Sequence, residues 1–147
     1  MNRDDVISTL NDLIETSRDG EEGFRTCAEN VKNATLKTFF FEKAERCRLG
    51  AEQLQQIVRE MGGDPSTGGS AVGGAHRFWV RLRGTISGMD DHAILDECER
   101  GEDSAKEAYR AALKQEMPGD VRRVVERQYA EVKTNHDRVR EMRNATA

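Results

Sequence analysis

Apolar residues recur at intervals of three and four along four long segments of the chain, which is the period of an α-helix that buries one face. The pattern predicts helices over residues 3–32, 34–61, 91–116 and 120–143. Along the first of these, the inward line runs through Val6, Leu10, Leu13, Ser17, Gly20, Phe24, Cys27 and Val31. Asn33 and Asp90 precede the second and third helices as candidate N-caps, and Gly62 and Gly63 follow the second helix as a stop.

The segment between the two helical pairs, residues 62–91, is much longer than the links within each pair. Its first half is rich in Gly, Ser and Pro, and its second half predicts a short helix over about residues 75–86. Short links favour antiparallel hairpins, whereas the long middle link can cross the bundle, as it does in ferritin-like bundles but not in up-down bundles. We therefore predict an all-α fold with a single ferritin-like four-helix-bundle domain over 1–147. It consists of two antiparallel hairpins joined by a long crossover with a short extra helix.

Composition and charge narrow the class of protein without changing this fold. The formal net charge is −4 and 34% of the residues are charged, with both signs present, so we expect no nucleic-acid partner. No apolar run approaches the roughly 18 residues of a membrane-spanning helix, so we expect no membrane partner. The N-terminus lacks the apolar core of a secretion signal, which favours a cytoplasmic location. Cys27, Cys47 and Cys98 have no CxxC spacing, and we expect three small buried hydrophobic side chains, the alternative being a disulfide or redox pair.

The two hairpins resemble copies of one unit, and each copy carries one inward carboxylate. When Gly20 is aligned with Gly101, Glu21 falls on Glu102. Each of the two glutamates shares a seven-residue line with apolar side chains, and such a line stays on one face of a helix. Both carboxylates are therefore predicted to face the interior of the bundle, while the acids next to them are surface residues.

The geometry of a hairpin predicts which residues lie level with these two carboxylates, and counting back from the predicted turns adds four candidates. The full set is Glu21, Cys47, Arg48, Glu102, Asn135 and His136. A buried carboxylate needs a partner, so we expect these side chains to form a buried polar layer. In ferritin-like carboxylate proteins, an inward layer of this kind holds two metal ions.

Three stretches of the chain, in their order and spacing, resemble a known family: "DGEEGFR" at 19–25, "AHRFW" at 75–79 and "ILDECERGEDSAKEAYR" at 94–110. They are similar to a bacterial family of ferritin-like four-helix bundles whose function is unknown, within the ferritin-like superfamily. The resemblance covers nearly the whole chain and implies the fold. Where residues match the metal-binding pattern it also implies ligands for iron or manganese, and these candidates are Glu21, Glu102 and His136.

The chain departs from the metal-binding pattern in its second and fourth helices. Dimetal ferritin-like proteins use a Glu-x-x-His pair in each of two helices, and no such pair occurs in this sequence. The corresponding registers read "CRLG" or "ERCR" in the second helix and "KTNH" or "NHDR" in the fourth. Arg48 and Lys133 bring positive charge into or beside the layer, where it repels a metal cation and where an Arg can pair with a carboxylate. We therefore expect a metal-free layer without a cofactor, the alternative being a weak or intersubunit site for iron or manganese.

Two functions are consistent with this sequence. The first is a noncatalytic bundle that acts through self-association or an unidentified protein partner. The second is a metal-binding or redox protein of the stress response, a ferritin-like metal-dependent oxidoreductase with a degenerate or intersubunit di-iron-type centre. We favour the first and expect no catalytic residues. A homo-oligomer is indicated because Phe39, Phe41, Phe78 and Trp79 supply more apolar surface than one bundle needs.

Overall fold

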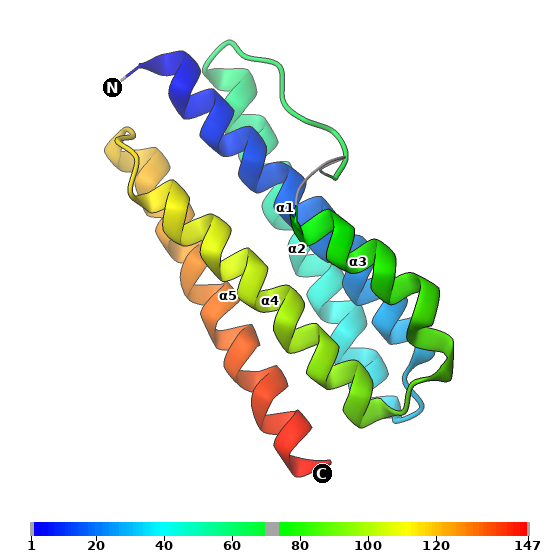
Figure 1. The fold of residues 1–147 in the computed structure, drawn as a ribbon. Coiled ribbons are helices and arrows are strands. Elements are labelled where there is room, and N and C mark those ends of the chain that lie inside the picture. The colour runs from blue at the N-terminus through cyan, green and yellow to red at the C-terminus, as the bar shows by residue number, and fades with distance from the viewer. Residues whose placement is uncertain (1, 70–73, 147) are drawn as a thin grey trace.

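The computed structural model describes residues 2–69 and 74–146, and most of these residues are helical. The elements are α1 (Arg3–Asn30), α2 (Ala34–Glu60), α3 (Gly74–Thr85), the 3-10 turn η1 (Ile86–Gly88), α4 (Asp91–Leu113) and α5 (Gly119–Ala145). Figure 1 shows α1–α2 and α4–α5 as two antiparallel hairpins lying side by side, with α3 running along α1 and α4. The predicted hairpins, the long crossover and its short helix are all confirmed.

Polar side chains begin three of the long helices, and glycine ends one of them. Side-chain oxygens accept hydrogen bonds from backbone N–H groups of the first turn in three places: Asn2 from Asp4 at 2.7 Å, Asn33 from Leu36 at 3.0 Å, and Asp90 from Ala93 at 2.8 Å. Gly62 has a φ of 83°, a left-handed conformation that favours glycine. The N–H of Gly63 then donates to the carbonyl of Val58 at 3.0 Å, which closes the end of α2.

The turn between α1 and α2 is attached to the other hairpin. The carboxylate of Asp91, at the start of α4, accepts hydrogen bonds from the backbone N–H groups of Lys32 at 2.8 Å and Asn33 at 3.0 Å. These N–H groups point toward α4 and not back along α1. For this reason α1 ends at Asn30, two residues before the end that the periodicity predicts.

The four long helices are unevenly spaced around the bundle. Helix α1 packs along α2 and α4, and α4 packs along α5, whereas α2 and α5 approach each other closely at few points. Helix α3 contacts α1 and α4 and covers the seam between them. The bundle is therefore tightly closed on the α1–α4 side and spread on the α2–α5 side.

A polar layer divides the apolar core into two clusters along the length of α1. One cluster contains Leu10 and Leu54, and the other contains Phe24, Phe40 and Leu95. The buried polar side chains between and beside these clusters are Ser17, Asp19, Gln55, Glu102, Gln128, Asn135 and His136. Polar groups in such positions need hydrogen-bond partners, so the middle of the bundle is where specific chemistry is concentrated.

Two mid-helix glycines make room for the single tryptophan of the sequence. The indole ring of Trp79, from α3, lies against Gly23 of α1 and Gly101 of α4. A Cβ atom added at either glycine would stand 2.4 Å from a ring carbon, well inside van der Waals contact. The glycines thus allow α3 to seat its aromatic side chain between the two hairpins, which explains why glycine interrupts both helices.

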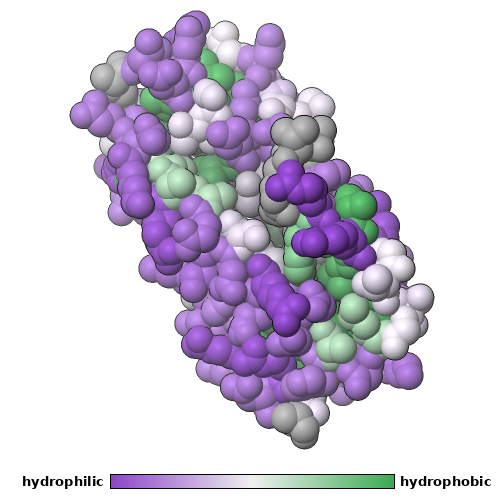
Figure 2. Space-filling view, in the orientation of Figure 1, coloured by the Kyte–Doolittle hydropathy of each residue, from purple (hydrophilic) through white to green (hydrophobic). Residues whose placement is uncertain are grey.

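Two of the four aromatic side chains expected at a surface are buried within this single chain. Phe39 and Trp79 belong to the core, Phe78 is half-buried against it, and Phe41 is 44% exposed. Figure 2 shows one face of the molecule, largely hydrophilic with hydrophobic side chains gathered over α3. None of the helices in residues 2–69 and 74–146 is long and apolar enough to span a membrane.

The cysteines differ in their surroundings. Cys27 of α1 and Cys98 of α4 are fully buried as free thiols, with their sulfur atoms 2.9 Å apart. Both therefore match the expected role of small buried side chains. Cys47 of α2 is only half-buried, and it lies in the polar layer described below.

Candidate functional site

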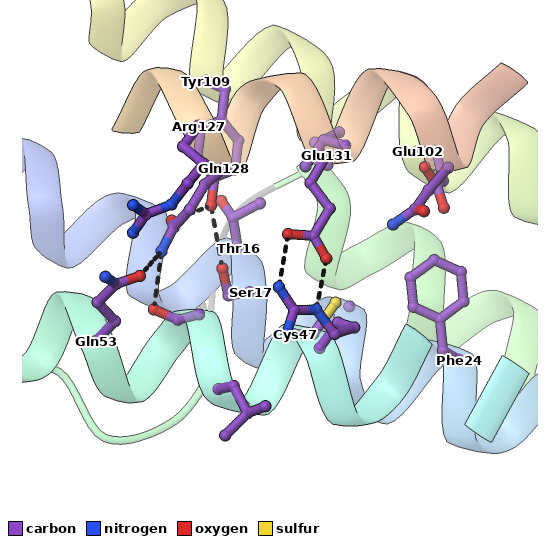
Figure 3. A pocket seen from close by; sticks show the side chains of 18 of the residues that line it. Thr16, Ser17, Phe24, Cys47, Gln53, Glu102, Tyr109, Arg127, Gln128 and Glu131 are labelled. Carbon is purple, nitrogen blue, oxygen red and sulfur yellow. Dashed lines mark hydrogen bonds and ion pairs between the residues drawn. The ribbon is translucent and has the colours of Figure 1, made fainter. Parts of the chain in front are cut away.

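A cavity of about 550 Å³ lies in the middle of the bundle, with walls from α1, α2, α3, α4 and α5. This volume falls within the range of small-molecule pockets in proteins. Figure 3 shows the cavity from close by, with α5 along one side and α2 along the other. Its polar lining residues are Thr16, Ser17, Arg46, Cys47, Gln53, Glu102, Tyr109, Arg127, Gln128, Glu131 and Asn135. The cavity occupies the space left where α2 and α5 spread apart.

One ion pair bridges the two hairpins across this space. Arg46 of α2 donates from Nε and Nη2 to the two carboxylate oxygens of Glu131 of α5, at 2.7 and 3.1 Å. The hydrogen bonds from Arg46 lower the pKa of the Glu131 carboxyl, which therefore stays ionised. Both carboxylate oxygens of Glu131 are engaged, so this acid has little capacity left for another ligand.

A hydrogen-bonded network fills one end of the cavity. The hydroxyl of Tyr109 donates to Oε1 of Gln128 at 2.8 Å and lies 3.5 Å from the hydroxyl of Ser17. The Gln128 amide in turn donates to the carbonyl of Gly50 at 3.3 Å and to Oε1 of Gln53 at 3.1 Å. The side chains of Tyr109 and Gln128 are therefore hydrogen-bonded within the protein itself, and the network joins α4 and α5 to α1 and α2.

Glu102 occupies a different part of the cavity, near Phe24, as Figure 3 shows. Its side chain is buried, and its Oε1 atom has no hydrogen-bond partner among the residues that the structure describes. Desolvation by burial raises the pKa of the carboxyl to about 8, against the weaker opposing effect of Lys43. At neutral pH Glu102 is thus mainly a neutral carboxyl group that can both donate and accept a hydrogen bond.

Asn135 and His136 follow each other on α5, but only Asn135 lines the cavity. His136 is buried with its Nε2 2.8 Å from a carboxylate oxygen of Asp103 and its Nδ1 3.2 Å from Asp137. The contact between His136 and Asp103 places α4 and α5 in register. Glu102 and Asn135 each precede one member of this contact, so they lie at the same level of the bundle.

The two predicted residues of α2 have different positions. Cys47 lines the cavity, and burial raises the pKa of its thiol far above the ordinary value. The guanidinium of Arg48 instead binds Glu45 and Glu52 along the outer side of α2. One residue corresponds to roughly 100° around a helix, which turns Arg48 away from the cavity. The prediction that Arg48 joins the buried layer is therefore wrong, and the cations in the cavity wall are Arg46 and Arg127.

Two other predicted groups also lie outside the cavity. The carboxylate of Glu21 is bound by Arg18 at 2.8 Å and by Arg25 at 3.1 Å, so it is a largely buried, ion-paired side chain on α1 that does not line the cavity. Its neighbour Gly20 lines the cavity in its place. Lys133 is exposed, with its ammonium 4.4 Å from the ring centre of Tyr129. Of the predicted layer, the structure thus brings together Cys47, Glu102 and Asn135.

Several residues that line the cavity were not predicted from the sequence, although the pattern of apolar positions indicates two of them. Tyr109 and Gln128 stand on the inward lines of their helices, where a polar side chain among apolar ones indicates a buried partner. Arg46 and Glu131 carry no such signal because they resemble ordinary surface charges. Their pairing depends on the distance between α2 and α5, which periodicity does not encode.

A further buried acid lies outside the cavity. Asp19 of α1 is buried and stands 3.1 Å from Nδ1 of His76 at the start of α3. Gly69 of the crossover approaches it so closely that an added Cβ would lie 2.0 Å from a carboxylate oxygen. Asp19 therefore marks where the crossover and α3 lie against α1, which is a structural role.

The donor set of the cavity does not fit the two-metal centre of ferritin-like proteins. Such a centre draws on four glutamates and two histidines, whereas the acids here are a neutral Glu102 and a Glu131 held by Arg46. The remaining donors are mostly amides and hydroxyls, which the cavity holds beside the guanidinium groups of Arg46 and Arg127. Across residues 2–69 and 74–146, no three His, Cys, Asp or Glu side chains are grouped closely enough to hold a metal ion.

Comparison with known proteins places this geometry in a family. A ferritin-like, diiron-carboxylate protein from Bacillus anthracis str. Ames is 17% identical over 97% of this chain and 99% of its own, with a TM-score of 0.74. The bacterioferritin-related protein from Bacteroides fragilis, described as a dodecameric thioferritin, is also 17% identical, over 99% of this chain and 88% of its own, with a TM-score of 0.76. These likenesses show the ferritin-like four-helix fold, and no curated protein matches the sequence. The model of the family described as Domain of unknown function (DUF2383) matches residues 5–115, so the chain belongs to that family.

Proposed function

We propose that this chain is a noncatalytic ferritin-like bundle that binds a small organic molecule in its central cavity and works without a dimetal centre. The observation that carries the proposal is the cavity of about 550 Å³ with a buried carboxyl oxygen of Glu102 that has no partner. Buried polar atoms in folded proteins are nearly always hydrogen-bonded, so an unpaired one that lines a cavity is a place for a ligand atom. The other walls supply aromatic and polar contacts, as small-molecule sites do.

The reactive groups of the cavity favour binding over catalysis. Burial raises the pKa of both the Cys47 thiol and the Tyr109 hydroxyl, and the neutral forms of these groups are poor nucleophiles. The hydroxyl of Tyr109 is also engaged by Gln128. These side chains therefore suit a site that holds a molecule unchanged.

Filling the cavity tests the proposal. Ala105 of α4 lines the cavity, whereas Ala111 of the same helix is exposed, so Ala105→Leu and Ala111→Leu form a matched pair. Trp79 also lines the cavity and is the single tryptophan of the chain, so its fluorescence reports on occupancy. We expect native mass spectrometry of the purified protein to detect a bound organic molecule that Ala105→Leu loses and Ala111→Leu keeps. Equal occupancy in both variants would contradict the proposal.

Elemental analysis tests the metal-free part of the proposal. We expect less than stoichiometric iron and manganese in protein purified from cells grown with both metals. A crystal soaked with either metal should show no strong anomalous peak beside Glu102. A peak there, or between subunits, would favour the alternative of a metal-binding or redox protein over the function proposed.

We also propose that copies of the chain associate. Two apolar side chains of α2, Phe41 and Leu49, are 44% and 41% exposed, and the related Bacteroides fragilis protein is described as dodecameric. Sedimentation equilibrium should detect an oligomer that Phe41→Ser weakens. A monomer at all concentrations would remove self-association and leave a different protein partner as the occupant of this face.

A further inference from the structure

Two polar groups near one level of the cavity lack partners, and together they define what a ligand must offer there. Oε1 of Glu102 is buried without a hydrogen bond, and Glu102 is 4% exposed. Asn135 is buried as well, lines the same cavity, and its side chain forms no hydrogen bond within residues 2–69 and 74–146. The His136–Asp103 contact places these two side chains at one level of the bundle.

Aromatic side chains form the wall beside this pair. Phe24 and Trp79 both line the cavity, with their ring centres 5.9 Å apart and their planes at 57° to each other. Trp79 packs against Gly101, which directly precedes Glu102. Figure 3 shows the Phe24 ring on the same side of the cavity as Glu102. Phe24 and Trp79 therefore supply aromatic surface to the cavity close to these two polar groups.

The charges around this pair disfavour a cationic ligand, and burial disfavours an anionic one. The acid of the opposite wall, Glu131, is already neutralised by Arg46. Lys43 and Lys106 are the cations that act on Glu102, with Asp103 as the opposing acid, so an ammonium ligand would face two like charges. A carboxylate ligand would be attracted by these lysines and by Arg127 of the cavity wall, but it would have to lose its hydration to reach the buried carboxyl of Glu102, at a cost in desolvation.

We propose that the cavity binds a small, planar, uncharged molecule whose amide-type group hydrogen-bonds to Glu102 and Asn135 while its ring packs on Phe24 and Trp79. This inference rests on the proposed ligand-binding function and names the class of ligand. A carboxamide or lactam offers one donor and one acceptor side by side. The carboxyl group of Glu102 and the carboxamide of Asn135 can each match that arrangement.

Three probes of nearly equal size and shape separate the possible classes. Benzamide is the uncharged amide, benzoate carries a carboxylate, and benzylamine carries an ammonium. We expect benzamide to change the fluorescence of Trp79 with saturation, and to bind at least about tenfold more tightly than the other two. Ala105→Leu should abolish the signal of benzamide, and Ala111→Leu should retain it.

Variants of Glu102 then identify the contact. Glu102→Gln keeps a donor and an acceptor, so we expect benzamide affinity within about threefold of the parent. Glu102→Leu removes both and should weaken benzamide about tenfold or more. Glu107→Leu, at an exposed position of α4, is the matched control and should leave affinity unchanged. Circular dichroism checks that each variant is folded. Asn135→Leu removes the second hydrogen-bonding group and should independently weaken the binding of benzamide.

Each outcome bears on one of the two proposals. If benzylamine binds best and Glu102→Gln abolishes its binding, the ligand is a cation and the inference is overturned, while the ligand-binding function stands. If benzoate binds best, the inference is likewise overturned. If no probe binds, and native mass spectrometry finds the same amount of bound organic molecule in Ala105→Leu and Ala111→Leu, the cavity is not a ligand site and both proposals fall.

Discussion

Among single residues, Glu102 has a protonation state at neutral pH that the fold determines. Burial raises the pKa of its carboxyl from about 4.5 to about 8. Between these values the unfolded chain releases a proton that the folded chain keeps, so the free energy of unfolding falls as pH rises from 4.5 to 8. Each pKa unit corresponds to about 1.4 kcal/mol, so this carboxyl opposes folding by several kcal/mol above pH 8.

Glu102→Gln should therefore become progressively more stable than the parent as pH rises. We predict a difference in unfolding free energy that grows by several kcal/mol between pH 5 and pH 8 and is constant above that range. Urea unfolding of both proteins at five pH values from 5 to 9 measures it. A difference that does not change with pH would mean that Glu102 is solvated in the folded protein.

Gly101 shows how one missing side chain determines the packing of another. Alanine normally stabilises a helix interior by roughly 0.5–1 kcal/mol relative to glycine. Here the new Cβ would lie 2.4 Å from the Trp79 ring, so the indole must move. We predict that Gly101→Ala lowers the unfolding free energy by about 1–3 kcal/mol and shifts the emission of Trp79 to the red. Gly84→Ala is the control, because nothing lies within 4 Å of its added Cβ, and it should not destabilise the protein.

Between elements, two polar contacts join the helices with unequal strength. Arg46 and Glu131 link α2 to α5, but their side chains are 55% and 34% exposed, and solvent screens such a pair. Tyr109 links α4 to α5 through a buried hydrogen bond to Gln128. Removing one partner of a buried bond leaves the other unsatisfied, which costs more than the loss of a surface ion pair.

This contrast gives a prediction for two substitutions. We expect Arg46→Ala to change the unfolding free energy by less than about 1 kcal/mol. Tyr109→Phe should lower it by about 1–3 kcal/mol, since Oε1 of Gln128 loses its donor. Chemical denaturation under identical conditions compares them. A larger loss from Arg46→Ala would show that the ion pair, and not the buried network, holds the two hairpins together at this level.

At the scale of the whole molecule, helical periodicity and link lengths predict the fold well. They place the two hairpins and the crossover, and they identify the caps Asn33 and Asp90. The observed helices differ from the predicted ones at their ends. One example is Asn30, after which the backbone N–H of Lys32 donates to the carboxylate of Asp91 in the other hairpin. Helices can be predicted from the local sequence because each helix buries one face, and the spacing of the apolar residues indicates which face that is.

The site is less predictable, because a shift of one residue turns a side chain by roughly 100° around the helix. Glu102 and Asn135 stand on the predicted inward lines, and both line the cavity. Arg48 and Glu21 are each one position from residues that do so. Arg48 is bound on the outer side of α2, whereas Glu21 is largely buried and is bound by Arg18 and Arg25 of its own helix. The cavity itself depends on how far α2 stands from α5, which no single helix specifies.

Because the four helices are unevenly spaced, the α1–α4 side of the bundle is expected to be more rigid than the α2–α5 side. Trp79 locks α1 to α4, whereas α2 and α5 are joined mainly by polar side chains around a hollow. Local opening is easiest where few apolar contacts must be broken. In hydrogen–deuterium exchange, the middle amides of α1 and α4 should exchange more slowly than the middle amides of α2 and α5. Separation of α2 from α5 is then the route by which we expect a ligand of the proposed site to enter and leave the cavity.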